Sequence, residues 1–215
     1  MKNKMSKMRG FTLVELLIVI ALIAILSVAV LATINPIEQS NKARDASFKN
    51  DAAEILNAFE RYYTSSSHYP WMDVTGVGVS SISDTVVIGS TTPAFGVVGV
   101  GGSPGLLVST SELKSSFSGK APFQATATEE DKMYVVHNGD TNDNYVCFHP
   151  KAAANRSQTS LLKCLDPTGG TNAKGKLYNY GGNGNTCVKP VSWESANLAP
   201  SGTSANLMCV PEGTI

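Results

Sequence analysis

The stretch FTLVELLIVIALIAILSVAVLATI (residues 11–34) decides the fold of this chain, and it follows the basic leader MKNKMSKMRG (residues 1–10). As a helix its 24 residues would cover about 36 Å, which is enough for a bilayer core of about 30 Å. Glu15 is the only charged residue in the stretch. Residues 11–34 therefore predict a helix that can span a membrane.

The leader contains four basic residues and no acidic residue. Because basic flanks of a membrane helix stay in the cytoplasm, we expect residues 1–10 inside the cell and everything after Ile34 outside. An ordinary secretory signal would have a shorter apolar stretch, followed by a small-residue cleavage site. This segment is too long and lacks such a site, so we expect it to stay in the chain.

Glu15 needs an explanation, because a carboxylate inside a hydrocarbon layer costs about 2.5–3.5 kcal/mol. If the chain were cut between Gly10 and Phe11, the new amino group would lie four residues before Glu15. That spacing places the amine and the carboxylate on one face of a helix. Glu15 could then neutralise its own terminus or that of a neighbouring chain.

Gly10, Phe11 and Glu15, in the sequence GFTLVE after a basic leader, resemble the class III signal of type IV pilins and of the pseudopilins of type II secretion and DNA uptake. The resemblance is specific over residues 7–34. It implies that a prepilin peptidase cuts after Gly10 and methylates Phe11. It also implies that Glu15 pairs with a neighbour's amine during filament assembly. A single-span anchor with a chance acid is the alternative interpretation.

Residues 38–63 predict an amphipathic continuation of the helix. Their apolar side chains recur at steps of three and four, a stripe that a helix turns toward a core; they are Phe48, Ala52, Ile55, Phe59 and Tyr62. The other faces carry charges that we mostly expect in solvent, namely Lys42, Arg44, Asp45, Lys49, Asp51, Glu54 and Glu60.

Pro36 predicts a helix break, because proline removes a backbone donor and disfavours helix at the residue before it. A kink or an open turn is therefore expected near Ile34. Many pilins carry their helix-bending proline earlier, where this chain has Ala32. Pro36 either serves the same purpose or bends the chain at the membrane exit without a role in assembly.

Residues 64–215 are rich in Gly, Ser, Thr and Asn, with short apolar runs that favour strands separated by turns. We expect a short helix at 112–117, a polar hairpin loop at 138–144, and strands at 85–88, 133–137, 145–148, 177–180 and 207–210. The fold class is α+β and pilin-like: a long N-terminal helix, with a membrane half and an amphipathic half, packed on an antiparallel sheet. We expect a cytoplasmic leader that is removed (residues 1–10) and then the assembly half of the helix (residues 11–34). The amphipathic continuation of the helix (residues 35–63) and an extracytoplasmic β-rich head (residues 64–215) follow.

The four cysteines all lie in the part expected outside the cell, which predicts two disulfides; they are Cys147, Cys164, Cys187 and Cys209. Three pairings are possible. We favour Cys147 with Cys164 and Cys187 with Cys209, each closing a loop of about twenty residues. A metal site is the competing use, but the spacing contains no C-x-x-C pair.

No residue pattern indicates an enzyme, a bound metal or a cofactor. Asp140, Asn142 and Asn144 alternate as calcium ligands do, but Tyr145 stands where an EF-hand loop requires glycine. No serine or cysteine has a base and an orienting acid beside it in the sequence. The three histidines are scattered, and we expect His149 at the surface.

The whole chain has 17 basic and 17 acidic residues, and loss of the leader leaves 13 basic residues and a net charge of −4. Such a head has no general attraction for nucleic acid, so none is expected as a partner.

The function expected from the resemblance is that of a structural subunit. It would wait in the cytoplasmic membrane as a single-pass precursor with its head outside, then polymerise into an extracellular type IV pilus filament. Its expected partners are other copies of itself, prepilin peptidase/methyltransferase, the inner-membrane assembly machinery and, before assembly, membrane lipid. The alternatives are a pseudopilin of a type II secretion or DNA-uptake machine and an anchored binding module that does not polymerise.

Overall fold

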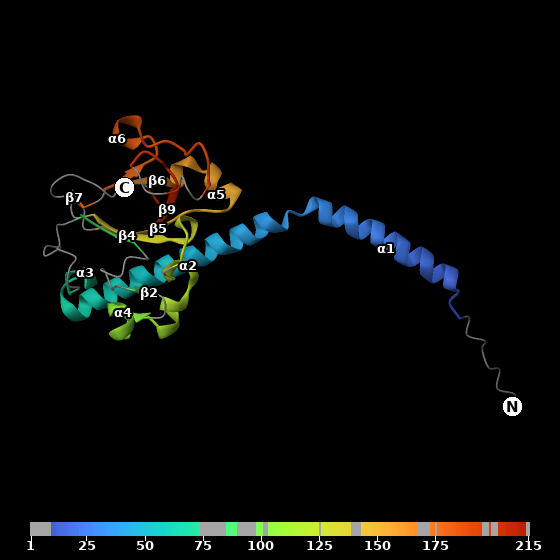
Figure 1. Cartoon of the computed structure of the whole chain (residues 1–215), viewed down its shortest axis with the longest axis horizontal. Coiled ribbons are helices and arrows are strands. Elements are labelled where there is room, and N and C mark those ends of the chain that lie inside the picture. Colours follow the sequence, from blue (N-terminus) through green and yellow to red (C-terminus); the bar gives the residue numbers. More distant parts are fainter. Residues whose placement is uncertain are drawn as a thin grey trace, which may run out of the picture. The chain divides into compact units, whose positions relative to one another are not determined.

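The computed structural model describes residues 10–73, 85–89, 98–100, 103–124, 126–138, 143–166, 173–174, 176–194, 198 and 202–213. The chain divides into two compact units, Met1–Ser40 and Asn41–Ile215. Figure 1 shows a long helix, α1, in the first unit and a head of helices and strands in the second.

Helix α1 (Leu13–Thr33) begins at the N-cap residue Thr12 and is long and apolar enough to cross a membrane. Its large hydrophobic side chains are exposed to solvent in the isolated chain. The helix ends before Ile34, which is extended (φ −99°, ψ 125°).

Helix α2 (Pro36–Ser66) has its own N-terminal cap. The Glu38 N–H donates to Oδ1 of Asn35 at 3.2 Å, and the Gln39 N–H donates to the Asn35 carbonyl at 3.2 Å. Pro36 occupies the first helical position, where a missing N–H costs nothing and the fixed φ favours helix. The chain therefore stops one helix and starts a second one, rather than bending a single helix.

The sheet of the head has the strand order β7-β1-β4-β5-β9-β6-β8. All neighbours pair antiparallel except β1 and β7, which pair parallel. The strands are β1 (Thr85–Gly89), β4 (Met133–Asn138), β5 (Asp143–Phe148), β6 (Leu162–Asp166), β7 (Ala173–Lys174), β8 (Lys176–Asn179) and β9 (Leu207–Val210). The five expected strands are confirmed, and β6 and β7 were not expected. Of the expected hairpin loop, residues 139–142 lie outside the described residues.

Helix α2 packs on one face of this sheet, which confirms the α+β fold class (Figure 1). The stripe of residues Phe48, Ala52, Ile55, Phe59 and Tyr62 is buried. It belongs to one cluster with residues of β4, β5 and β9, namely Met133, Val135, Val146, Phe148 and Met208. The three-and-four spacing therefore identified the core face of the helix correctly.

The alternate residues of the same strands form a second cluster on the opposite face of the sheet, with Tyr134, Val136, Tyr145 and Leu207 among its members, and Leu165 of β6 joins it. Strands β4 and β8 are not neighbours in the sheet order, yet they contact each other. The sheet therefore curls around this second cluster.

The segment between α2 and β4 contains short elements: α3 (Pro70–Asp73), β2 (Gly99–Val100), β3 (Ser103–Pro104), α4 (Leu106–Ser109) and 3-10 turns at Ser115–Gly119, Ala121–Phe123 and Glu129–Asp131. The helix expected at 112–117 is confirmed only in part: residues 115–117 belong to the 3-10 helix Ser115–Gly119, whereas residues 112–114 are not helical. Ser111 adopts a left-handed conformation (φ 65°), which ends α4. Glu112 then lies in a bend, and its carbonyl oxygen accepts a hydrogen bond from Arg61.

The disulfides join Cys147 to Cys209 and Cys164 to Cys187, so the favoured pairing of sequence neighbours is wrong. Cys147 and Cys209 are directly opposite each other on the paired strands β5 and β9. Cys164 belongs to a different cluster, with Cys187, which follows the short helix α6 (Gly182–Asn185). Strand register, rather than loop length, decides the pairing.

Candidate processing and assembly site

Gly10 and Phe11 lie directly before α1 and are exposed. Phe11 is 84% exposed, and a Cβ on Gly10 would meet no heavy atom within 4 Å. The peptide bond between them is therefore accessible, in this isolated chain, to an enzyme that would cut it.

Thr12 and Glu15 form a capping box at the start of α1. The Glu15 N–H donates to Thr12 Oγ1 at 3.2 Å. In return the Thr12 N–H and hydroxyl both donate to Glu15 Oε2, at 2.9 and 2.8 Å. Sequence reasoning did not single out Thr12, although Thr-x-x-Glu before an apolar run is a recognisable capping signal.

The capping box orients the carboxylate of Glu15. Its Oε2 is occupied by Thr12, whereas no hydrogen bond involves its Oε1 within the described ranges. A negative charge in the first turn also interacts favourably with the positive end of the helix dipole. The geometry therefore leaves one carboxylate oxygen available to a further donor.

The rest of α1 offers no other charged group. Its serine, Ser27, is satisfied within the helix, because Oγ donates to the Ile23 carbonyl at 2.7 Å. This arrangement suits an apolar environment, where each polar group needs an internal partner. Glu15 is thus the one side chain of α1 that a neighbour can pair with by charge.

Pro36 is the first residue of α2, after the extended Ile34. It is not part of the group formed by Gly10, Phe11 and Glu15, which lies at the other end of α1. The four cysteines lie in the head, as two disulfides with no free thiol.

A buried carboxylate in α2, Asp45, holds the helix against the head, and the expectation of a solvated side chain is wrong. Asp45 is 1% exposed. It accepts the backbone N–H groups of Lys151 and Ala152, both at 2.9 Å, and the side-chain amide of Asn155 at 2.8 Å. These donors come from the turn after β5 and from α5 (Ala153–Ser157). Asp51 is also buried and pairs with Lys120 at 2.5 Å.

Arg44 extends this attachment. Its guanidinium donates to the Asp131 carboxylate at 2.9 Å, to the His149 carbonyl at 3.0 Å and to the Glu130 carbonyl. Burial alone would raise the pKa of Asp131, but hydrogen bonding from Arg44 and the nearby charge of Lys151 hold that pKa below its ordinary value.

His149 is buried, so its expected surface position is wrong. Its Nδ1 lies 3.0 Å from the Asn206 carbonyl, and its ring packs edge-on against Tyr134. Burial lowers the pKa of His149 to about 4. The ring is therefore neutral at pH 7.

No group of three metal-ligating side chains occurs among the described residues. Asn144 lies on β5, whereas Asp140 and Asn142 lie outside the described residues. The described residues of the head therefore do not show whether the three residues of the calcium pattern come together.

Comparison with known proteins gives one match, to the family model described as the prokaryotic N-terminal methylation motif, over residues 5–31. No curated protein and no solved structure matches the chain. The matched residues contain the accessible Gly10–Phe11 bond and the capping box of Glu15, and they extend through most of α1. This chain therefore carries the N-terminal methylation motif that is the class III signal of type IV pilins and pseudopilins.

Proposed function

We propose that this chain is a structural subunit that polymerises into a type IV pilus filament after cleavage at Gly10 and methylation of Phe11. The observation that carries the proposal is the methylation motif, joined to an apolar helix whose side chains are exposed and whose single carboxylate is held in a fixed orientation. The family of this motif consists of structural pilin subunits.

Before assembly, α1 resides in the cytoplasmic membrane, with residues 1–10 in the cytoplasm and the head outside. The basic leader supports this orientation. The motif implies processing by a prepilin peptidase and the use of pilus assembly machinery in general. Cleavage then removes the leader and leaves a positive amine at Phe11.

Assembly transfers α1 from lipid to a bundle of α1 helices. Lipid tails solvate apolar side chains as well as leucine does, so the hydrophobic effect drives this step little. Close packing and the pairing of Glu15 must supply most of the preference. An amine from another copy can donate to Glu15 Oε1, because Oε2 is already occupied by Thr12.

This contact joins two different surfaces, the amine of one copy and the carboxylate of another. Such a heterologous contact need not close into a ring, and its repetition produces an open helical fibre. A polymer of this kind needs no enzymatic activity in the subunit.

Substituting Glu15 by alanine tests the proposal. The Glu15→Ala chain is expected to enter the membrane and to be processed, because Gly10 and Phe11 are unchanged, yet to give few or no filaments in sheared surface material under the electron microscope. Glu38→Ala, a loss of charge outside α1, is the matched control and should assemble normally. Abundant normal filaments from Glu15→Ala would exclude the proposed role.

The mass of the N-terminus separates the alternatives. A methylated Phe11 terminus together with surface fibres supports a pilin, and the same terminus with only short, machine-bound fibres supports a pseudopilin of a secretion or DNA-uptake machine. A mature chain that still begins at Met1 would support an anchored binding module and overturn the proposal.

A further inference from the structure

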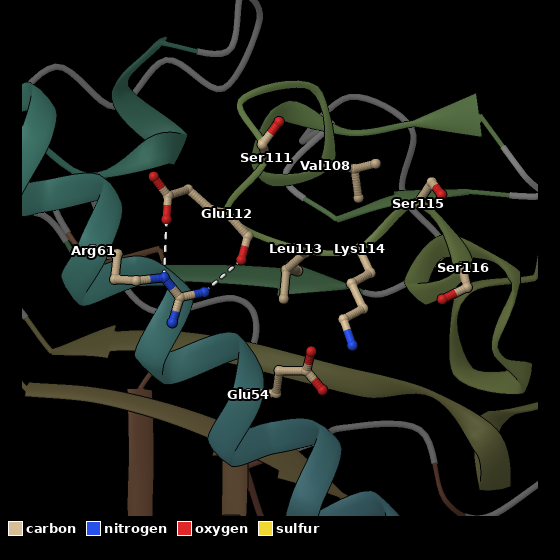
Figure 2. A pocket seen from close by; sticks show the side chains of 9 residues that line it. All are labelled: Glu54, Arg61, Val108, Ser111, Glu112, Leu113, Lys114, Ser115 and Ser116. Carbon is tan, nitrogen blue, oxygen red and sulfur yellow. Dashed lines mark hydrogen bonds and ion pairs between the residues drawn. The ribbon is translucent and has the colours of Figure 1, made fainter.

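A pocket of about 750 Å³ lies in the head between the outer surface of α2 and residues 108–116 (Figure 2). On one side, Arg61 of α2 donates from Nε to the Glu112 carboxylate at 3.0 Å and from its terminal nitrogen to the Glu112 carbonyl. This double contact fixes the wall of the pocket.

Two side chains of opposite charge line the pocket and form no ion pair among the described residues. Glu54 of α2 and Lys114 of the facing segment both line the pocket and are exposed. Figure 2 shows the two side chains extending into the space between α2 and that segment. Within the described ranges neither side chain has an ion-pair partner, so both are available to a ligand that carries charges of both signs.

Residues 188–194, the protruding loop, lie elsewhere on the head and are held at both ends. At the first end Val188 follows the disulfide-bonded Cys187; its N–H donates to the Thr203 carbonyl at 3.0 Å, and its carbonyl accepts from Ala205 at 2.7 Å. At the other end the guanidinium of Arg156 lies 4.7 Å from the ring centroid of Trp193. These contacts hold both ends of the loop in place, and its middle lies between them.

The protruding loop combines apolar exposure with opposite charges. Among the described residues of the head, the exposed large hydrophobic side chains are Tyr180, Val188 and Val191, and Val191 is fully exposed. Lys189 and Glu194 flank Val191, are exposed, and have no ion-pair partner in the described part of the chain.

We propose that the protruding loop of one copy docks into this pocket of the next copy. Val191 enters the pocket, Lys189 faces Glu54, and Glu194 faces Lys114. This inference rests on the proposed function, because it describes a head-to-head contact within the filament. Complementary charges across an interface fix its register and exclude wrong partners.

The loop and the pocket lie on different surfaces of the head, as the repeating contact of an open polymer requires. Figure 1 shows α6, which leads into the loop, and α4, which borders the pocket, on different sides of the head. A contact between two different surfaces leaves a free loop and a free pocket after each addition, so it propagates instead of closing.

Charge reversal in the full chain, in cells that process and assemble it, tests this docking. Glu54→Lys is expected to lower the yield of sheared filaments by about tenfold, because like charges are placed opposite each other in the interface. Adding Lys189→Glu to the same chain reverses the pair and is expected to restore the yield to within about twofold. Glu60→Lys, an exposed glutamate of α2 that does not line the pocket, is the matched control.

The outcomes separate the docking from the proposed function. A normal filament yield from Glu54→Lys overturns the docking. A lowered yield that Lys189→Glu fails to restore also overturns it, if the purified variant melts like the unchanged chain. Neither result contradicts the proposal that the chain forms a filament. Absence of filaments from the unchanged chain overturns the proposed function, and the docking with it.

Discussion

Asp45 carries its carboxylate in an almost fully buried position and accepts hydrogen bonds from two backbone groups and one side-chain amide. Asp45 also pairs with the Arg44 guanidinium at 3.2 Å. Removing one partner of a buried ion pair leaves the other charge uncompensated, which costs about 3–5 kcal/mol. We expect Asp45→Ala to lower the free energy of unfolding by about this amount. The measurement is denaturant unfolding of the detergent-solubilised chain, followed by the fluorescence of the buried Trp71.

Lys42→Ala, which changes an exposed charge one turn earlier in α2, is the control and should shift the unfolding midpoint little. An unchanged midpoint for Asp45→Ala would show that the turn after β5 does not depend on this carboxylate.

Thr12 is expected to matter through Glu15. Thr12→Val removes the hydroxyl that accepts from the Glu15 N–H and donates to its carboxylate. A lost N-cap costs about 0.5–2 kcal/mol, so the filament yield should fall by about twofold to thirtyfold. Thr12→Ser keeps the hydroxyl and should keep the yield. Equal yields from the two variants would contradict a positioning role, and the N-terminal mass checks that both chains are processed.

His149 gives the head a dependence on pH. The imidazole binds a proton below about pH 6.5 in the unfolded chain, but only below about pH 4 in the folded chain. Because the unfolded state binds more protons between these values, stability is complete above pH 6.5 and falls by about 3 kcal/mol as the pH drops to 4. Unfolding of the solubilised chain at pH 7, 5.5 and 4.5 should show this fall.

His149→Gln removes the titrating ring and should flatten the pH dependence in that window, whereas His68→Gln, on a histidine that is not fully buried, should retain it. The pKa of Asp131 is depressed, so this carboxylate loses its contribution only at lower pH, below its ordinary value near 4. A slope that persists in His149→Gln would assign the pH effect to another group.

The sequence pattern predicted some residue positions and missed others for a definite reason. Spacing identified Phe48 to Tyr62 as a core stripe, because burial of apolar side chains repeats with the helix turn. Asp45 lies three residues before Phe48, so it continues the same stripe. Its charge suggested solvent, and only the turn after β5, distant in sequence, supplies the donors that make its burial favourable.

At the scale of elements, the same contrast holds for strands and cysteines. The five expected strands could be read from short apolar runs between turn residues, whereas the run LKCLD of β6 (Leu162–Asp166) contains a lysine and an acid and gives a weaker signal. The register of β5 against β9 depends on contacts between distant parts of the chain. Local sequence could not supply it, and the disulfide pairing follows from it.

The two disulfides are expected to stabilise the head unequally. Cys147 and Cys209 are separated by 62 residues and Cys164 and Cys187 by 23 residues. The loop-entropy model gives about 4 kcal/mol for the longer loop and about 3 kcal/mol for the shorter one. We therefore expect the double alanine variant of Cys147 and Cys209 to unfold at a lower denaturant concentration than that of Cys164 and Cys187.

Peptide mapping without reduction checks the connectivity directly and must give one peptide pair that contains Cys147 and Cys209. A pair that joins Cys147 to Cys164 would restore the interpretation from loop length. Equal stability of the two double variants would instead indicate that the loop-entropy difference is offset by packing in the folded head.

At the scale of the whole molecule, the candidate site was predictable where its signal is local. Gly10, Phe11 and Glu15 follow one another in a short motif, and the family match covers the same stretch. The pocket beside α2 was not predictable, because only the fold of the segment before β4 brings Lys114 to the same pocket as Glu54. A local motif therefore identifies the start of α1, and long-range packing creates the surfaces of the head.

The head is expected to fold without α1. The buried clusters of the described residues begin at Phe48, the unit Asn41–Ile215 is compact by itself, and Asn35 supplies an N-cap for α2. A chain of residues 35–215, exported to an oxidising compartment, should be soluble, form both disulfides and melt in one cooperative transition, because the exposed apolar surface of α1 is gone. It should also give no filaments, since it lacks Glu15. Aggregation or non-cooperative melting of this chain, with both disulfides formed, would show that the head depends on α1 for its stability.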